Sequence, residues 1–178
     1  MGLFLIESTL TGIVATKAEL DQKAAVLQAE LKENHSALIE LQVSKDFSRS
    51  FFIIEGEDRT VATDRLRAAG IPVQLVKEVR LVGKELADVK ENNDVVNYLV
   101  EWNIPENITM DQYLARKNKN SVHYQEVPEV AFSRTYVCED MTKCLCFYDA
   151  PNVAAVKRAR EAVQTPIDSI TEILAAKE

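Results

Sequence analysis

The chain has 178 residues, 47% hydrophobic and 28% charged, which is enough apolar material for one large packed domain or two small ones. The net charge is −7 and the pI is near 5.0. This acidic balance argues against nucleic acid and anionic membranes as partners, because phosphate binding requires Lys and Arg gathered on one surface. The apolar run at the start ends at Glu7 and no segment approaches a membrane span, so we expect a cytoplasmic protein.

The first half of the chain predicts the order strand, helix, strand, strand, helix, strand. Apolar, β-branched and aromatic residues predict strands at 3–9, 38–43, 51–54 and 75–82. Helical spacing predicts two amphipathic helices, carried by Leu20, Ala24, Leu27 and Leu31 and by Val61, Ala62, Leu66 and Ala69. Asp58 stands where the second helix needs an N-cap, and Gly70 stands where it should end.

The second half predicts the same order again. Strands are expected at 95–103, 132–137, 145–148 and 167–174, with helices near 110–118 and after an N-cap at Asn152. The last helix should bury a stripe formed by Val153, Val156, Ala159 and Val163, leaving Lys157, Arg158 and Arg160 on a solvated face. The polar stretch 118–128 is expected to be a plain loop rather than a lid.

One ungapped shift relates the two halves. Residues of the first half recur 94 positions later, with Val43, Asp46, Pro72 and Glu78 matched by Val137, Asp140, Pro166 and Glu172. We therefore predict an α+β protein of two tandem ferredoxin-like (βαββαβ) repeats, residues 1–83 and 95–178, joined by a polar connector at 84–94. The apolar sheet faces need cover, so the repeats should pack as an intrachain dimeric α/β barrel, making a monomer with an internal pseudo-dimer; pairing across a homodimer is the alternative.

Short motifs of the second half resemble a known family. Phe132-Ser133-Arg134-Thr135-Tyr136-Val137-Cys138-Glu139-Asp140, the strand end Cys146-Phe147-Tyr148-Asp149-Ala150-Pro151, and the segments 98–101 and 104–106 carry the resemblance. They are similar to a family of small ferredoxin-like proteins of unknown function whose described member binds nickel.

The resemblance implies a dimeric α/β-barrel fold and binding of nickel or another divalent transition metal. The family's motif histidine falls on Arg134 in the second repeat and on Glu40 in the first. Arginine cannot ligate a metal and Glu40 offers a single hard oxygen. Metal binding would therefore need other ligands in this chain.

Cys144 and Cys146 are the first candidates for such ligands. They alternate along one predicted strand, so both thiols should point to the same face and could form a soft metal site with His123. The alternative is that they are buried core residues, as free cysteines most often are, and that His123 is a surface residue.

A second group of candidates suggests an organic ligand. Glu7 and Glu101 are equivalent under the shift and could form a carboxylate pair, and Tyr98 and Tyr136 could line a pocket beside them. The alternative places the glutamates between strands and helices and the tyrosines in the ordinary core.

These candidates leave three functions open. We expect a non-enzymatic protein that binds a small ligand or a nickel-like transition metal ion. A cofactor-free barrel enzyme on a small organic substrate, with the two glutamates as acid and base, is the second hypothesis. The third is an interaction module with a protein partner, because the fold by itself does not choose a function.

Overall fold

The computed structural model describes residues 1–91 and 95–174. The chain divides into two compact units, residues 1–79 and 80–178. The α+β class expected from the sequence is confirmed, since both units combine antiparallel strands with helices.

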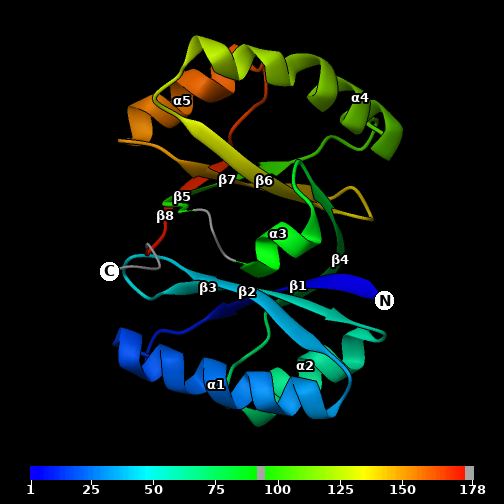
Figure 1. Ribbon diagram of the computed structural model, residues 1–178, viewed down its shortest axis with the longest axis vertical. Coiled ribbons are helices and arrows are strands. Elements are labelled where there is room, and N and C mark those ends of the chain that lie inside the picture. Colours follow the sequence, from blue (N-terminus) through cyan, green and yellow to red (C-terminus); the bar gives the residue numbers. More distant parts are fainter. Residues whose placement is uncertain (92–94, 175–178) are drawn as a thin grey trace. The chain divides into compact units, whose positions relative to one another are not determined.

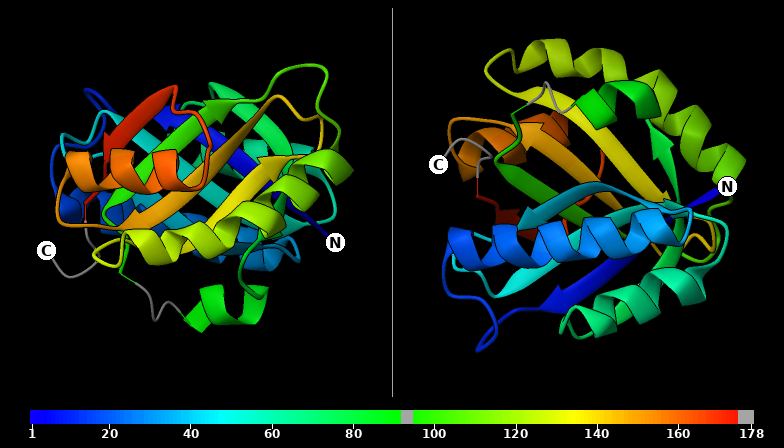
Figure 2. Two further views of the ribbon diagram at one scale, coloured as in Figure 1. Left: turned by 90° about the horizontal axis from the view of Figure 1, so that it is seen from above. Right: turned by 60° about the horizontal axis from the view of Figure 1, so that its bottom comes forward.

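The first unit contains one four-stranded sheet with two helices on one of its faces (Figures 1 and 2). Its elements are β1 (Gly2–Thr9), α1 (Lys17–Glu33), β2 (Ala37–Val43), β3 (Arg49–Gly56), α2 (Arg59–Ala68) and β4 (Leu75–Val82), the last of which continues past Val79 into the second unit. The strand order is β2-β3-β1-β4. Thr16 caps α1 by accepting from Glu19 N, and α1 buries Leu20, Leu27 and Leu31. This is the leucine stripe that the sequence predicts.

The second unit has strand order β6-β7-β5-β8, with α4 and α5 on one face of the sheet (Figure 1). Its elements are α3 (Leu86–Glu91), β5 (Tyr98–Asn103), α4 (Met110–Asn120), the 3₁₀ helix η1 (Ser121–Glu126), β6 (Ala131–Cys138), β7 (Lys143–Asp149), α5 (Val153–Ala162) and β8 (Ser169–Glu172). Apart from α3 and η1, the order β-α-β-β-α-β is the same as in the first unit.

The hairpin turns of the two units use the same chemistry. Asp46 Oδ1 accepts from the backbone N and the hydroxyl of Ser48, and Asp140 Oδ1 accepts from the same two groups of Thr142. The intervening residues, Phe47 and Met141, both have positive φ. Each aspartate thus closes a tight turn that its own side chain stabilises.

Other local features also recur 94 residues apart. The N-caps of α2 and α5 are Asp58 and Asn152, as predicted, and the β-bulges near residues 38–40 and 132–134 interrupt β2 and β6 at equivalent positions. Gly70, predicted to end α2, has φ +78°, and Gln164 has φ 55° at the equivalent place after α5. The same backbone geometry is therefore built with different residues in the two units.

Three expectations are corrected in the second unit. The stretch 118–128 is not a plain loop, because α4 runs to Asn120 and η1 follows, anchored by Tyr124 and Val127. Val153 does not join the buried stripe of α5 but is 39% exposed, whereas Ala155 and Val156 in the same turn are buried. Arg160 is not on a solvated face but is 1% exposed.

The predicted strands 95–103 and 167–174 are shorter in the structure, at Tyr98–Asn103 and Ser169–Glu172. Part of the predicted connector, Asn92-Asn93-Asp94, lies outside the described residues. Within the described residues, no helix has the length and apolar character needed to cross a bilayer.

The Asp46 turn generates a prediction about acid stability. Hydrogen bonds from Ser48 and then Ser44 lower the pKa of Asp46 from 3.8 to about 2. A lowered native pKa stabilises the folded state above pH 3.8, and this contribution is lost as the pH falls through about 2. Urea unfolding at a series of pH values should show Asp46→Ala less stable than wild type near neutrality and level with it below pH 2. A stability difference that does not change with pH would contradict the assignment.

Candidate functional site

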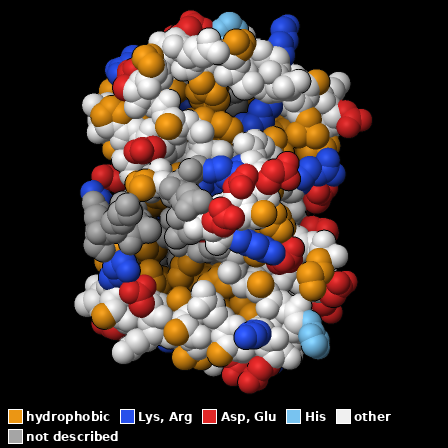
Figure 3. Space-filling model, in the orientation of Figure 1, with side chains coloured by type: hydrophobic (Ala, Val, Ile, Leu, Met, Phe, Trp, Pro, Cys, Tyr) orange, Lys and Arg blue, Asp and Glu red, His pale blue; other side chains and the backbone are white. Residues whose placement is uncertain are grey.

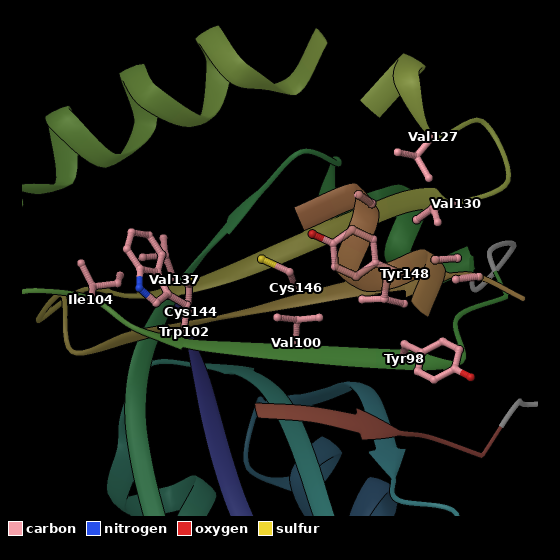
Figure 4. Packing of buried hydrophobic residues seen from close by; sticks show 14 of the residues in the cluster. Tyr98, Val100, Trp102, Ile104, Val127, Val130, Val137, Cys144, Cys146 and Tyr148 are labelled. Atoms are coloured by element: carbon pink, nitrogen blue, oxygen red, sulfur yellow. The ribbon is translucent and has the colours of Figure 1, made fainter. Parts of the chain in front are cut away.

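The helix-facing side of the second sheet holds the site with the most chemistry. Tyr98, Val100 and Trp102 of β5 face the helices, and so do Cys144, Cys146 and Tyr148 of β7. Figure 4 shows Cys146 with its sulfur on the side of the sheet toward α4, between Trp102 and Tyr148. The two thiols therefore share one face, as the alternation along β7 predicts.

Two hydrogen-bond donors converge on the sulfur of Cys146. The hydroxyl of Thr135 donates at 3.1 Å from β6, and Nη1 of Arg160 donates at 3.3 Å from α5. The thiol of Cys144 on the same face of β7 and the phenol of Tyr113 on α4 are further polar neighbours of this sulfur. All of these groups are buried in an otherwise apolar layer, so the sulfur is the focus of the polar network.

Arg160 links this sulfur to two phenols. Its Nη1 also donates to Tyr148 Oη at 3.1 Å, and that hydroxyl is 2.7 Å from Tyr124 Oη on η1. Its Nη2 donates to the carbonyl oxygen of Pro166 at 2.6 Å, while its Nε has no acceptor in the described part of the chain. Across residues 1–91 and 95–174, no carboxylate pairs with Arg160, so this buried guanidinium depends on a sulfur, a phenol and a carbonyl.

The network perturbs the pKa values of its members. The neighbouring thiol of Cys144, and then the charges of Lys117 and Arg160 and the hydroxyl of Thr135, lower the pKa of Cys146 against the opposing effect of burial. The pKa of Cys144 is raised, first by its interaction with Cys146 and then by burial. Burial also raises the pKa of Tyr148. Since the guanidinium touches Cys146 directly, Cys146 is the thiol of the pair that ionises first.

A cavity of about 780 Å³ opens beside this network. Its lining combines apolar side chains with charges of both signs: Arg80, Leu81, Val82, Gly83, Lys84, Glu85, Leu86, Asp88 and Leu114. Figure 3 shows Lys or Arg side chains beside hydrophobic ones in the hollow under the helices of this unit. The cavity volume is within the range of small-molecule sites.

Gly83 connects the cavity to the aromatic residues of the network. A Cβ on Gly83 would lie 2.9 Å from a ring carbon of Phe132, and its φ is +91°, so the chain passes over Phe132 only because residue 83 is glycine. The Phe132 ring stacks on Tyr124 at 5.2 Å, and Lys117 Nζ lies 4.4 Å from its centroid. Tyr124 thus lies between Phe132, which Gly83 of the cavity lining contacts, and Tyr148, whose hydroxyl accepts from Arg160.

The three predicted metal ligands are not brought together. His123 lies on η1 with 44% of its side chain exposed and contacts Glu126 through Nδ1 at 2.5 Å, whereas Cys144 and Cys146 are buried. Within the described residues, no group of three or more His, Cys, Asp or Glu side chains could hold a metal ion. Because a guanidinium also contacts Cys146, this donor set does not fit nickel.

The predicted ligand-binding residues are also distributed over different places. Tyr98 is on the helix-facing side of its sheet, whereas Tyr136 packs edge-on against Phe147 on the opposite face, which Glu101 shares. Glu7 belongs to the first unit.

The two glutamates have equivalent partners. Arg49 Nη2 donates to Glu7 at 3.1 Å and Lys143 Nζ donates to Glu101 at 3.0 Å, in each case from the neighbouring strand. Both carboxylates are buried, Glu7 at 9% and Glu101 at 6% exposure. The ion pairs give both glutamates a structural task, which the sequence pattern did not distinguish from acid–base chemistry.

Sequence reasoning missed Arg160 and Tyr124. Arg160 directly follows the apolar stripe residue Ala159, but a cationic run on a helix is most often solvated, and only the packing of α5 against β7 reveals its burial. Tyr124 was not predicted because the stretch 118–128, which contains it, was expected to be a loop without packed residues.

Comparisons with known proteins give a partial relationship. Residues 98–173 match the family model described as "Nickel responsive protein SCO4226-like", which covers less than half of the chain. No curated protein matches the chain.

Solved structures extend the likeness to the whole chain. A candidate chlorite dismutase, TA0507, superposes with a TM-score of 0.60 at 13% identity, over 98% of this chain and 95% of that one. SCO4226 from Streptomyces coelicolor A3(2) matches 43% of this chain and 93% of its own, at 20% identity and a TM-score of 0.37. A candidate monooxygenase from Lactobacillus acidophilus NCFM covers 98% of this chain and 94% of its own, at 10% identity and a TM-score of 0.47. The first likeness is to a structure of the dimeric α/β barrel fold, and at such identity it does not define an activity.

The network predicts a specific cost for losing one hydroxyl. Tyr148→Phe removes the group that contacts both Tyr124 and Arg160 and leaves a buried guanidinium hydrogen without an acceptor. We expect a loss of about 1–3 kcal/mol in the free energy of unfolding, measured by urea titration. Tyr98→Phe is the matched control, because within the described residues the Tyr98 hydroxyl makes no hydrogen bond; equal losses in the two variants would contradict the network's role.

Proposed function

We propose that the protein is a non-enzymatic binding protein for a small amphipathic organic molecule, held in the second unit at the cavity formed by residues 80–88 and α4. The observation that carries this proposal is the cavity itself, whose volume of about 780 Å³ suits a small ligand. Its apolar wall, including Leu86 and Leu114, suits the body of such a molecule. The ionic groups beside that wall suit charged substituents.

The fixed geometry around the cavity supports the same function. Arg80 is held by two hydrogen bonds to Glu139, from Nε at 3.0 Å and from Nη2 at 3.1 Å. Lys84 Nζ donates to Ser133 Oγ at 3.4 Å. Cations positioned in advance lose less side-chain entropy when a ligand binds. Glu139 is already paired with Arg80, and Glu85 and Asp88 also line the cavity, but the Arg80 guanidinium has N–H donors beyond the two that it gives to Glu139. We therefore expect an anionic group of the ligand to lie near Arg80 and Lys84.

The proposal extends to the arrangement of the units. We propose that residues 1–83 and 95–178 are repeats that pair as the two halves of an α/β barrel within one chain. The whole-chain likeness to the TA0507 structure supports this, and so do the turns, caps, bulges and ion pairs that recur 94 residues apart. A homodimer remains the alternative arrangement.

Paired probes of opposite charge test the ligand site. 1-Naphthoate and 1-naphthylmethylammonium share an apolar body, and isothermal titration calorimetry should show tighter binding of the anion. Leu114→Asp adds a charge to the cavity wall and should weaken naphthoate binding at least tenfold. Ala115→Asp, the adjacent exposed position of α4, is the matched control and should leave binding unchanged. Binding of neither probe, or equal effects of the two aspartates, would contradict the site.

Nickel is the second candidate ligand, favoured by the family match over residues 98–173. Because the described donor set does not fit the ion, we expect native mass spectrometry with excess Ni²⁺ to show no stoichiometric uptake that depends on Cys144 or Cys146. Uptake of one or two ions per chain that is lost in Cys144→Ser and Cys146→Ser would overturn this expectation and restore the metal-binding hypothesis.

A further inference from the structure

The buried guanidinium of Arg160 requires a counter-charge. Arg160 is 1% exposed, and leaving an unpaired cation in such a position costs several kcal/mol. Its contacts are Cys146 Sγ, Tyr148 Oη and the Pro166 carbonyl oxygen. Of these, only the thiol and the phenol can become anionic.

The thiol is the better acid of the two. An ordinary thiol ionises near pH 8.5 and an ordinary phenol near pH 10. The hydroxyl of Thr135 also donates a hydrogen bond to Cys146, whereas the hydroxyl of Tyr148 is hydrogen-bonded to a second phenol, that of Tyr124. The donors therefore stabilise negative charge on sulfur, and the lowered pKa of Cys146 has the same direction.

The cover over this sulfur has fewer fully buried residues than α5. α4 buries one residue, Tyr113, and η1 contributes the partly buried Tyr124, whereas α5 buries four. Segments with few buried contacts open locally at low cost. Among residues 1–91 and 95–174, Nε of Arg160 has no acceptor, so it can donate a hydrogen bond to an oxygen atom that enters.

We propose that Cys146 is held as a thiolate against Arg160 beneath α4 and η1, and that this anion is an oxidation site for hydroperoxides, reached when α4 and η1 open. A thiolate is the nucleophilic form of cysteine, and a hydroperoxide is a small neutral oxidant able to enter a narrow opening. This site goes beyond the proposed ligand cavity and uses different residues.

The reaction requires no other reagent. A lone pair of the Cys146 sulfur attacks one peroxide oxygen, the O–O bond breaks, and the other oxygen leaves as hydroxide, or as alkoxide from an alkyl hydroperoxide. Sulfur loses two electrons and becomes sulfenic acid, and the peroxide gains the same two.

The polar and charged groups that face Cys146 come from five elements, and they set the pKa of its thiol. They are Cys144 and Tyr148 on β7, Thr135 on β6, Tyr113 and Lys117 on α4, Tyr124 on η1, and Arg160 on α5. The charged groups among them are cations, so each favours the thiolate.

Ultraviolet titration near 240 nm, where thiolates absorb, tests the charge state. Only a few per cent of an ordinary thiol is ionised at pH 7. We expect wild type to show close to one thiolate per chain at pH 7, lost in Cys146→Ala and kept in Cys138→Ala, the buried control whose pKa is raised by burial. Arg160→Met should abolish the thiolate signal at pH 7. If that variant does not fold, Thr135→Val takes its place: it keeps the charge of Arg160 but removes one hydrogen bond to Cys146, and should raise the pH midpoint of the signal. Absence of a Cys146-dependent signal at pH 7 would overturn the proposal.

Hydrogen peroxide with dimedone trapping tests the oxidation site. Mass spectrometry should locate the adduct on Cys146 rather than on Cys138 or Cys144. Thr109→Ala removes the capping box of α4 far from the sulfur and should raise the trapping rate about fivefold by promoting opening. Thr16→Ala removes the equivalent cap of α1 in the first unit and should leave the rate unchanged. An unmodified Cys146, or equal effects of the two cap variants, would overturn the assignment.

Discussion

The burial of Arg160 is the interaction on which the second unit depends. Its guanidinium draws contacts from β7 and from the segment after α5, and through Tyr148 it reaches η1. A buried cation at this position is stable only if several elements supply hydrogen-bond acceptors together. The position of α5 therefore depends on Cys146 and Tyr148 of β7, which accept from Arg160. The same requirement gives Cys146 a role beyond apolar packing, because its sulfur accepts a hydrogen bond from the buried guanidinium.

The first unit solves its packing without such a centre. Its long helix α1 covers the sheet with a stripe of leucines, and its ion pairs Lys17–Asp21 and Arg65–Glu30 lie on partly exposed groups. The second unit has the shorter α4 extended by η1, and its helix layer is completed by aromatic rings and polar contacts. The two units thus share an order of elements, while the cavity and the thiol network belong to the second.

Metal chemistry illustrates the limit of family resemblance. The match over residues 98–173 carries a nickel-responsive description, yet the position of the family's histidine holds Arg134, whose guanidinium lies 5.2 Å from the Phe147 ring centroid. On the opposite face of the sheet, Arg160 places its guanidinium against Cys146. Each cation disfavours a divalent metal ion at its own position, because like charges repel in a buried site.

The sequence by itself determined the elements whose signals are local. Asp58 and Asn152 as caps, Asp46 and Asp140 as turn residues, and the leucine stripe of α1 follow from side-chain chemistry within a few residues. The shared face of Cys144 and Cys146 follows from strand alternation alone. Tertiary structure decided the rest: that Arg160 is buried, that Tyr124 sits in a helical turn against Tyr148, that Tyr98 and Tyr136 lie on opposite faces, and that Glu7 and Glu101 have cationic partners. The physical reason is that burial and pairing depend on which elements meet in space, and residues far apart in the chain supply those contacts.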